Sequence, residues 1–188
     1  MEHYDTRGNR GAWCLYRTEA EVTHFEMLTF WDDTDAIKRF AVDDYSLAKY
    51  YNFDSDYLIE MEPHVRHYDV SSDSSPDLSQ PTDGRKVRGG STVARIWRGD
   101  VPTEKADAYL LSLVPFCFRD YQKHAGVCGI HLPHRMEEVR MQVLLLTFWE
   151  SRQAIAAYAG VDFAKAHYYA YDLECLIDHR LTSKTMRS

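Results

Sequence analysis

Three side chains in this sequence have the chemistry of a reaction site. His131 lies in an apolar run, His167 follows an aromatic and basic segment, and Arg98 ends a β-branched and aromatic run. An imidazole can exchange a proton near neutral pH, and a guanidinium can hold a phenolate or a carboxylate. We therefore predict catalytic roles for His131, Arg98 and His167. Arg95 replaces Arg98 if the strand turns it toward the site, and a structural or solvated role is the competing interpretation for each residue.

Aromatic side chains are the unusual feature of the composition. The chain has 13 Tyr, 8 Phe and 4 Trp, which is more than the core of a small protein requires. Such side chains can line a pocket for a flat ligand, although they also simply pack together. The residues predicted to bind a substrate are Trp149, Trp97, Tyr158 and Tyr168.

The bulk composition describes a globular chain and excludes two classes of partner. Of its 188 residues, 45% are hydrophobic, which is ample for packed cores. With 29 acidic and 22 basic residues and a formal charge of −7, the chain has no basic field for nucleic acid. No stretch approaches the roughly 20 apolar residues of a membrane span, and the N-terminus lacks the apolar core of a signal peptide. We expect no nucleic-acid or membrane partner and a cytoplasmic location.

The cysteines do not predict a metal or redox site. There are four, Cys14, Cys117, Cys128 and Cys175, and no two of them form a C-x-x-C pair. This spacing disfavours both a zinc site and a redox dithiol. We interpret them as reduced core thiols and expect no metal ligation.

An internal repeat organises the sequence. Sliding the chain by 118 residues aligns residues 29–59 with residues 147–177 without a gap. Unrelated segments of this length would agree at only about two positions. The identical pairs are Thr29 with Thr147, Phe30 with Phe148, Trp31 with Trp149, Ala36 with Ala154, Ile37 with Ile155, Ala41 with Ala159, Asp44 with Asp162, Ala48 with Ala166, Tyr50 with Tyr168, Tyr51 with Tyr169, Asp54 with Asp172, Leu58 with Leu176 and Ile59 with Ile177.

The repeat divides the chain into two copies of one α+β module. Residues 1–70 form the first copy, residues 71–90 a flexible linker rich in Ser, Asp and Pro, and residues 91–188 the second copy. In the second copy we expect strands at residues 92–98, 127–132, 139–149 and 175–181, and helices that start near residues 103 and 151. This β-α-β-β-α-β order is typical of a ferredoxin-like module.

The first copy starts late by this scheme. It has counterparts of the later elements at residues 11–17, 22–31, 34–43 and 65–70, but none of residues 93–121. The first module therefore lacks its initial strand and helix. A homodimer in which another chain completes this module is one expectation.

Four stretches connect the copies to a known family. They are residues 93–99 (Val-Ala-Arg-Ile-Trp-Arg-Gly), residues 8–13 (Gly-Asn-Arg-Gly-Ala-Trp), the Phe-Trp-Asp and Phe-Trp-Glu turns at residues 30–32 and 148–150, and residues 62–68 (Glu-Pro-His-Val-Arg-His-Tyr). Each copy resembles the antibiotic biosynthesis monooxygenase family. The resemblance implies ferredoxin-like modules in tandem that pack sheet against sheet, as in the dimeric α/β barrels.

The same resemblance implies a reaction. It suggests a monooxygenase-like enzyme that oxidises an aromatic or polycyclic phenolic small molecule without a metal or flavin, with Trp149 in the pocket wall. A deprotonated phenol can pass an electron to dioxygen itself, so the protein need supply only an apolar pocket, a base and dryness. The alternative is a non-catalytic small-molecule-binding or dimerisation protein, in which the first copy only caps the second sheet.

A second branch of the same superfamily degrades haem. Residues 163–167, Phe-Ala-Lys-Ala-His, are similar to the segment that carries its proximal histidine, which makes His167 a candidate haem ligand. The first copy has Lys49 at the equivalent position, and Ala157 stands where the haem enzymes carry Trp. Haem binding or haem degradation is therefore the further alternative.

Overall fold

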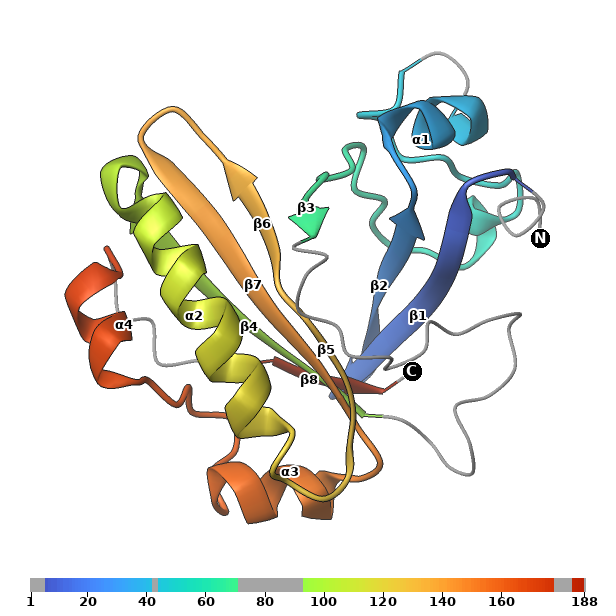
Figure 1. Cartoon of the computed structure of the whole chain (residues 1–188). Coiled ribbons are helices and arrows are strands. Elements are labelled where there is room, and N and C mark those ends of the chain that lie inside the picture. Colours follow the sequence, from blue (N-terminus) through green and yellow to red (C-terminus); the bar gives the residue numbers. More distant parts are fainter. Residues whose placement is uncertain (1–5, 42–43, 71–92, 178–183, 188) are drawn as a thin grey trace.

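Long antiparallel strands form the frame of the protein. The computed structural model describes residues 6–41, 44–70, 93–177 and 184–187, which adopt an α+β fold. The strands are β1 (Asn9–Glu19), β2 (Val22–Trp31), β3 (Asp69–Val70), β4 (Val93–Pro102), β5 (Val127–His131), β6 (Pro133–Met136), β7 (Arg140–Trp149) and β8 (Lys184–Arg187). In these residues they build one curled, half-barrel sheet (Figure 1) with the order β2-β1-β8-β4-β7-β6-β3, and β5 pairs with β7 beside this path.

Helices accompany both halves of the sheet. In the described residues these are α1 (Thr34–Ala41), α2 (Ala106–Tyr121), α3 (Arg152–Ala159) and α4 (Ala170–Cys175). Short 3-10 turns lie at Asp54–Asp56 and Thr103–Lys105. The longest helix, α2, lies across one face of β4 and β7 (Figure 1) and includes Pro115. Ser151 caps α3, since its Oγ accepts a hydrogen bond from Ala154 N at 3.1 Å.

Most of the predicted last strand lies outside the described residues. Of residues 175–181, only 175–177 are described, and Cys175 ends α4. This helix begins where Asp172 Oδ2 accepts a hydrogen bond from Tyr169 N at 2.8 Å. The last described strand is β8, which pairs antiparallel with β4.

The first half contains the β1–β2 hairpin, α1 and the short strand β3. Extended pairing was predicted for residues 65–70, but β3 is confined to Asp69–Val70, which pair with β6. The preceding residues are held elsewhere, since His64 bridges Leu47 and Val65 N donates to Ser46 O at 2.8 Å. Residues 42–43 and the predicted linker at residues 71–90 lie outside the described residues.

The sequence repeat reappears in strand register. The pair Trp13 and Leu28 in β1–β2 corresponds, 118 residues later, to the pair His131 and Leu146 in β5–β7. Both ladders also share an irregularity at the same relative position, next to Gly11 in one and Gly129 in the other. Two hairpins with the same register show that the duplication extends to three-dimensional structure.

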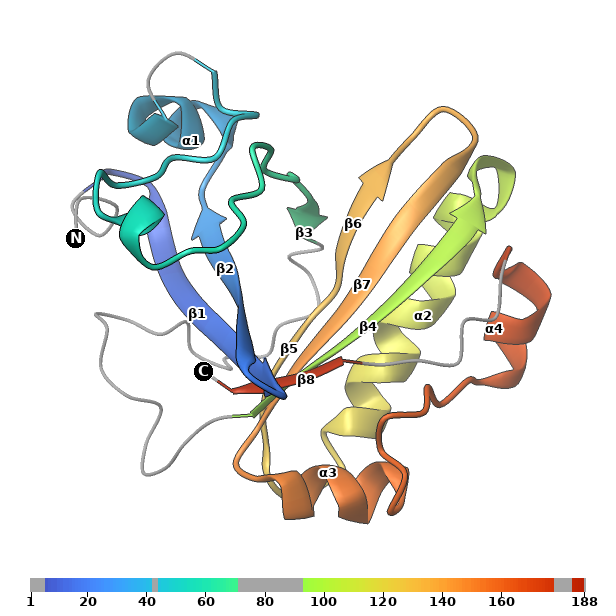
Figure 2. The same cartoon turned by 180° about the vertical axis from the view of Figure 1, so that it is seen from behind.

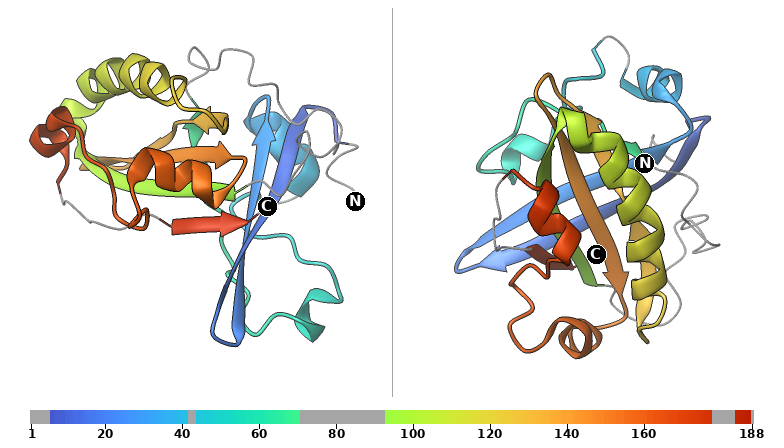
Figure 3. Two further views of the ribbon diagram at one scale, coloured as in Figure 1. Left: turned by 90° about the horizontal axis from the view of Figure 1, so that it is seen from below. Right: turned by 60° about the vertical axis from the view of Figure 1, so that its left-hand side comes forward.

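Two cores lie on opposite faces of the β4–β7 sheet. Alternation along β4 sends Trp97 toward α2 and Ile96 toward the β1–β2 hairpin. Figure 3 shows α2 and the hairpin on different sides of these strands. We call the first cluster the helix-side core and the second the hairpin-side core. In the described residues, no helix is long and apolar enough to span a membrane.

Candidate functional site

Trp149 lies at the centre of the helix-side core. Its side chain is fully buried, and its Nε1 donates a hydrogen bond to Thr147 Oγ1 at 2.9 Å. The rings of Tyr121 and Tyr158 lie 6.0 Å and 5.5 Å from the Trp149 ring, measured between centroids. The helix-covered face of the sheet therefore brings together two of the predicted substrate-binding residues, Trp149 and Tyr158. The side chain of Tyr121, from α2, lies between the sheet and the helix.

The other two predicted aromatic residues lie on the same side of the sheet. Trp97 is buried, and its ring lies 6.2 Å from that of Tyr168 in an edge-on arrangement. The Trp97 Nε1 is buried and meets no hydrogen-bond acceptor among the described residues. A buried donor without a partner costs roughly 1–3 kcal/mol.

Arg95 is the charged group of this face. Its side chain is only 2% exposed, although an arginine is rarely buried without a carboxylate. Its Nε donates to Phe163 O at 3.4 Å and its Nη2 to Lys165 O at 3.0 Å. A guanidinium has five N–H donors, and no ion pair with a carboxylate satisfies the others within the described residues. Arg95 therefore gives the helix-side core a positive charge, which two backbone carbonyls contact in the described residues.

A chain of phenols and a carboxylate borders the site. Tyr169 Oη donates to Asp120 Oδ2 of α2 at 2.7 Å, and the hydroxyls of Tyr158 and Tyr169 lie 3.3 Å apart. The ring of His167 packs 5.4 Å from that of Tyr169 and 6.2 Å from that of Tyr158. His124 contacts Tyr158 from another side, with ring centroids 4.7 Å apart.

The environment keeps these phenols protonated. Burial raises the pKa of Tyr121 well above its ordinary value, and the hydroxyl of Tyr158 adds to the effect. Burial also raises the pKa of Tyr169, together with its hydrogen bonds to Tyr158 and Asp120. Both side chains therefore act as neutral hydrogen-bonding groups.

Arg98 and His131 lie on the hairpin side of the sheet, away from this site. Arg98 Nη2 forms an ion pair with Glu26 Oε1 of β2 at 2.7 Å. The ring of His131 lies 5.0 Å from that of Phe30 and 6.2 Å from that of Trp13. Of the two arginines weighed for anion binding, the one that faces the helices is Arg95.

His131 is held in its neutral form. Burial among aromatic rings lowers the pKa of His131 to about 4. The hairpin-side core around it also contains Leu15 and Leu146, which are buried. His131 therefore has a low pKa and no place on the helix-covered face. It packs in the contact between the two copies.

Asp172 is a residue that the sequence reasoning did not single out. It is buried, and its Oδ1 accepts a hydrogen bond from the Tyr109 hydroxyl of α2 at 2.7 Å. Its other oxygen caps α4 through Tyr169 N. The signal was present in the repeat, because Asp54 occupies the same position in the first copy and its Oδ2 accepts from Tyr51 N at 2.7 Å.

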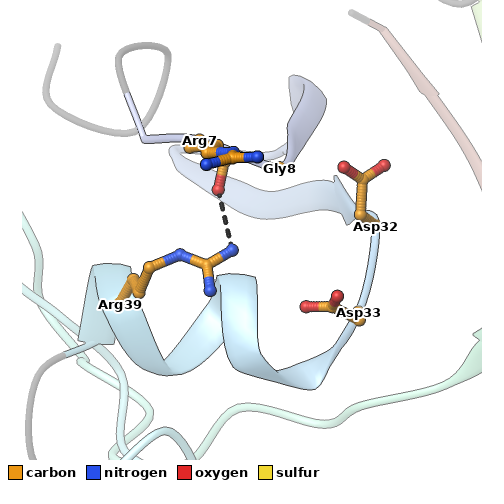
Figure 4. Close-up of a pocket in the computed structure, with 5 residues that line it drawn as sticks. All are labelled: Arg7, Gly8, Asp32, Asp33 and Arg39. Carbon is orange, nitrogen blue, oxygen red and sulfur yellow. Dashed lines mark hydrogen bonds between the residues drawn. The ribbon is translucent and has the colours of Figure 1, made fainter.

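A pocket lies at the start of the first copy. Figure 4 shows it between the β1 entry and α1, lined by Arg7, Gly8, Asp32, Asp33 and Arg39. Arg39 Nη2 donates to Arg7 O at 3.2 Å, and Asp33 Oδ1 caps α1 through Ala36 N at 2.7 Å. Its charges are balanced and it has no aromatic wall, so it does not suit a flat apolar ligand.

The exposed and buried thiols differ from the expectation of four core cysteines. Cys117 and Cys175 are buried, Cys128 is partly exposed and Cys14 is exposed on β1. None of the described residues form a group of three or more His, Cys, Asp or Glu side chains that could hold a metal ion.

No protein-family model, curated protein or solved structure matches the chain.

Proposed function

We propose that this protein is a monooxygenase-like enzyme that acts on an aromatic or phenolic small molecule without a metal or flavin. The observation that carries the proposal is Arg95, a buried cation without a carboxylate partner in the described residues, on a face with Trp97 and Trp149. An aromatic anion is the ligand that suits this set, because its ring would contact indole and phenol rings while its oxygen accepts from Arg95.

The proposal includes the architecture of the dimeric α/β barrels, built from ferredoxin-like modules in tandem. The order of elements supports this in the second copy, where β4, α2, β5 with β6, β7, α3 and β8 follow one another. The hairpin-side core supports the pairing of two sheets inside one chain. In it, Trp13 of the first copy stacks on Phe148 of the second, with ring centroids 5.0 Å apart.

The chemistry needs few groups from the protein. His167 accepts the phenolic proton, and Arg95 holds the resulting phenolate. The phenolate transfers one electron to dioxygen, and the two radicals combine to form a carbon-oxygen bond. Loss of water then leaves a carbonyl at the oxidised carbon. One dioxygen is consumed, one oxygen atom enters the product, and the other leaves as water.

The test uses a tricyclic anthrone, whose methylene carbon becomes a carbonyl in this reaction. Oxygen uptake and quinone absorbance should rise above the spontaneous rate when the full chain is added. Arg95→Gln should lower kcat/KM by about 100-fold, since it removes the charge that stabilises the anion. Arg95→Lys keeps the charge and reports on folding, and Arg98→Gln is the matched control, because its guanidinium lies on the other face. Oxygen uptake equal to that of buffer would end the enzyme proposal.

A non-catalytic small-molecule-binding or dimerisation protein is the second candidate. The close packing of the helix-side core argues against a reaction at its buried rings. Trp149 is fully buried and Tyr121 nearly so, which leaves these rings in contact with protein. The same experiment separates the candidates. Saturable quenching of tryptophan fluorescence by the anthrone, without oxygen uptake above the spontaneous rate, would favour the binding protein.

A further inference from the structure

One face of the β1–β2 hairpin is uncharged and open. Alternation places Trp13 and Leu15 in the hairpin-side core, so the neighbouring residues point to the opposite face. Phe25 is 57% exposed and Met27 is 55% exposed. We call this the open face; it comprises Ala12, Cys14, Tyr16, Thr18, Thr23, Phe25, Met27, Thr29 and Trp31.

The second copy shows what covers this face when the module is complete. Phe25 and Met27 correspond to Val143 and Leu145, which are 0% and 8% exposed in the helix-side core. The local geometry is already the same, because Trp31 Nε1 donates to Thr29 Oγ1 at 2.9 Å, as Trp149 donates to Thr147. The difference between the two faces is therefore their cover, which in the second copy is β4 and α2.

The edge of the sheet shows the same difference. β7 pairs with β4 along one edge, over ten residues of each strand. β2 also has ten residues, Val22–Trp31, but it ends the strand order of the described residues (Figure 2). A free, apolar strand edge is a template for pairing with another chain.

A buried hydroxyl indicates what kind of helix would suit the open face. Tyr51 is the counterpart of Tyr169, whose hydroxyl donates to Asp120 of α2. The Tyr51 hydroxyl is buried and has no hydrogen-bond partner in the described residues. The acceptor that it lacks is the one that α2 supplies in the second copy.

We propose that the open face binds a strand followed by an amphipathic helix from a different polypeptide. The strand pairs with the free edge of β2, and the helix lays apolar side chains on Phe25 and Met27 and brings a carboxylate to the Tyr51 hydroxyl. A second copy of this chain does not fit this role. Its own β4 and α2 already cover the helix-side core, and moving them would expose Trp149 and Tyr109.

The test uses the full chain and a defined probe, a peptide with the sequence of residues 93–121 fused to a soluble carrier protein. This probe carries the strand, the helix and Asp120. We expect saturable one-to-one binding and protection of the exposed Cys14 thiol from alkylation. The double variant Phe25→Lys/Met27→Lys should bind at least about ten-fold more weakly, because two charges would be buried under the helix. A matched control is Val139→Lys/Val161→Lys, two exposed apolar residues of the second copy, which should bind normally.

A double-mutant cycle tests the predicted hydrogen bond. Replacing Asp120 by Ala in the probe should weaken binding to the unaltered chain by about ten-fold, and should have little effect on Tyr51→Phe, which has no hydroxyl to satisfy. Absence of binding, or equal binding by the Phe25→Lys/Met27→Lys variant, would overturn the proposal. A dimer of the chain alone that dissociates in that variant would also overturn it, in favour of a second copy.

Discussion

Tyr16 pairs with Arg187 at the point where β1 meets β8. The residues 118 positions away from each, His134 and Asp69, pair with each other where β6 meets β3. Each copy thus contributes one strand, β3 from the first copy and β8 from the second, that extends the hairpin of the other copy. The hairpin-side core correspondingly contains equivalent residues from both, such as Phe30 and Phe148.

The ion pair between Arg98 and Glu26 should contribute to the contact between the copies and not to catalysis. Both side chains are about one-third exposed, so the expected coupling energy in a double-mutant cycle of Arg98→Ala and Glu26→Ala is small, about 0.5 kcal/mol. Urea unfolding at low and high salt would measure it, with a smaller value at high salt. A loss of substrate turnover in Arg98→Ala with normal stability would contradict the placement of Arg98.

His131 should make the protein less stable in acid. Its pKa is about 4 in the folded protein and about 6.5 in an unfolded chain, so the unfolded chain binds the proton more readily. The free energy of unfolding should therefore fall as the pH drops from about 6.5 to about 4, by at most about 3 kcal/mol. His131→Phe removes this proton site and keeps an aromatic ring.

The comparison of the two proteins at several pH values decides this prediction. The variant should gain stability relative to the unaltered chain as the pH falls below about 6.5. Parallel pH profiles for His131→Phe and the unaltered chain would show that His131 is not held neutral.

The two equivalent aspartates should differ in their importance for stability. Asp172→Ala removes the partner of the buried Tyr109 hydroxyl as well as the α4 cap, and should lower the free energy of unfolding by about 2–4 kcal/mol. Asp54→Ala removes only the contact with Tyr51 N and should cost about 1 kcal/mol. Denaturant unfolding of both variants gives the comparison, and equal losses would show that the Tyr109 hydrogen bond adds nothing.

Haem should not bind through His167. The rings of Tyr158 and Tyr169 pack against this imidazole, so a porphyrin seated on it would displace them. Titration with haemin should give no Soret shift that depends on His167. Any shift that does occur should be the same in His167→Ala. In the first copy Lys49 takes the equivalent place, with its Nζ 4.6 Å from the centroid of the Phe40 ring. A shift that depends on His167 would favour the haem alternative over the monooxygenase.

The sequence by itself determined the repeat and the strands of the β1–β2 hairpin. These follow from local patterns, since alternation gives strands and a fixed offset of 118 residues gives equivalent positions. Of the strand predicted at residues 175–181, only residues 175–177 are described. Cys175 belongs to a helix because Asp172 starts that helix through its side chain, and this contact is invisible to periodicity.

Only the tertiary structure decided which face of each strand is covered by helices. Alternation shows that Arg95 and Arg98 point to opposite faces of their strand and so cannot belong to the same core. It also shows that His131 faces either the helices of its own copy or the other copy. Two apolar faces look alike in sequence, since both are buried. Packing of the β1–β2 hairpin on one face and α2 on the other placed Arg95 at the candidate site and left Arg98 and His131 between the copies.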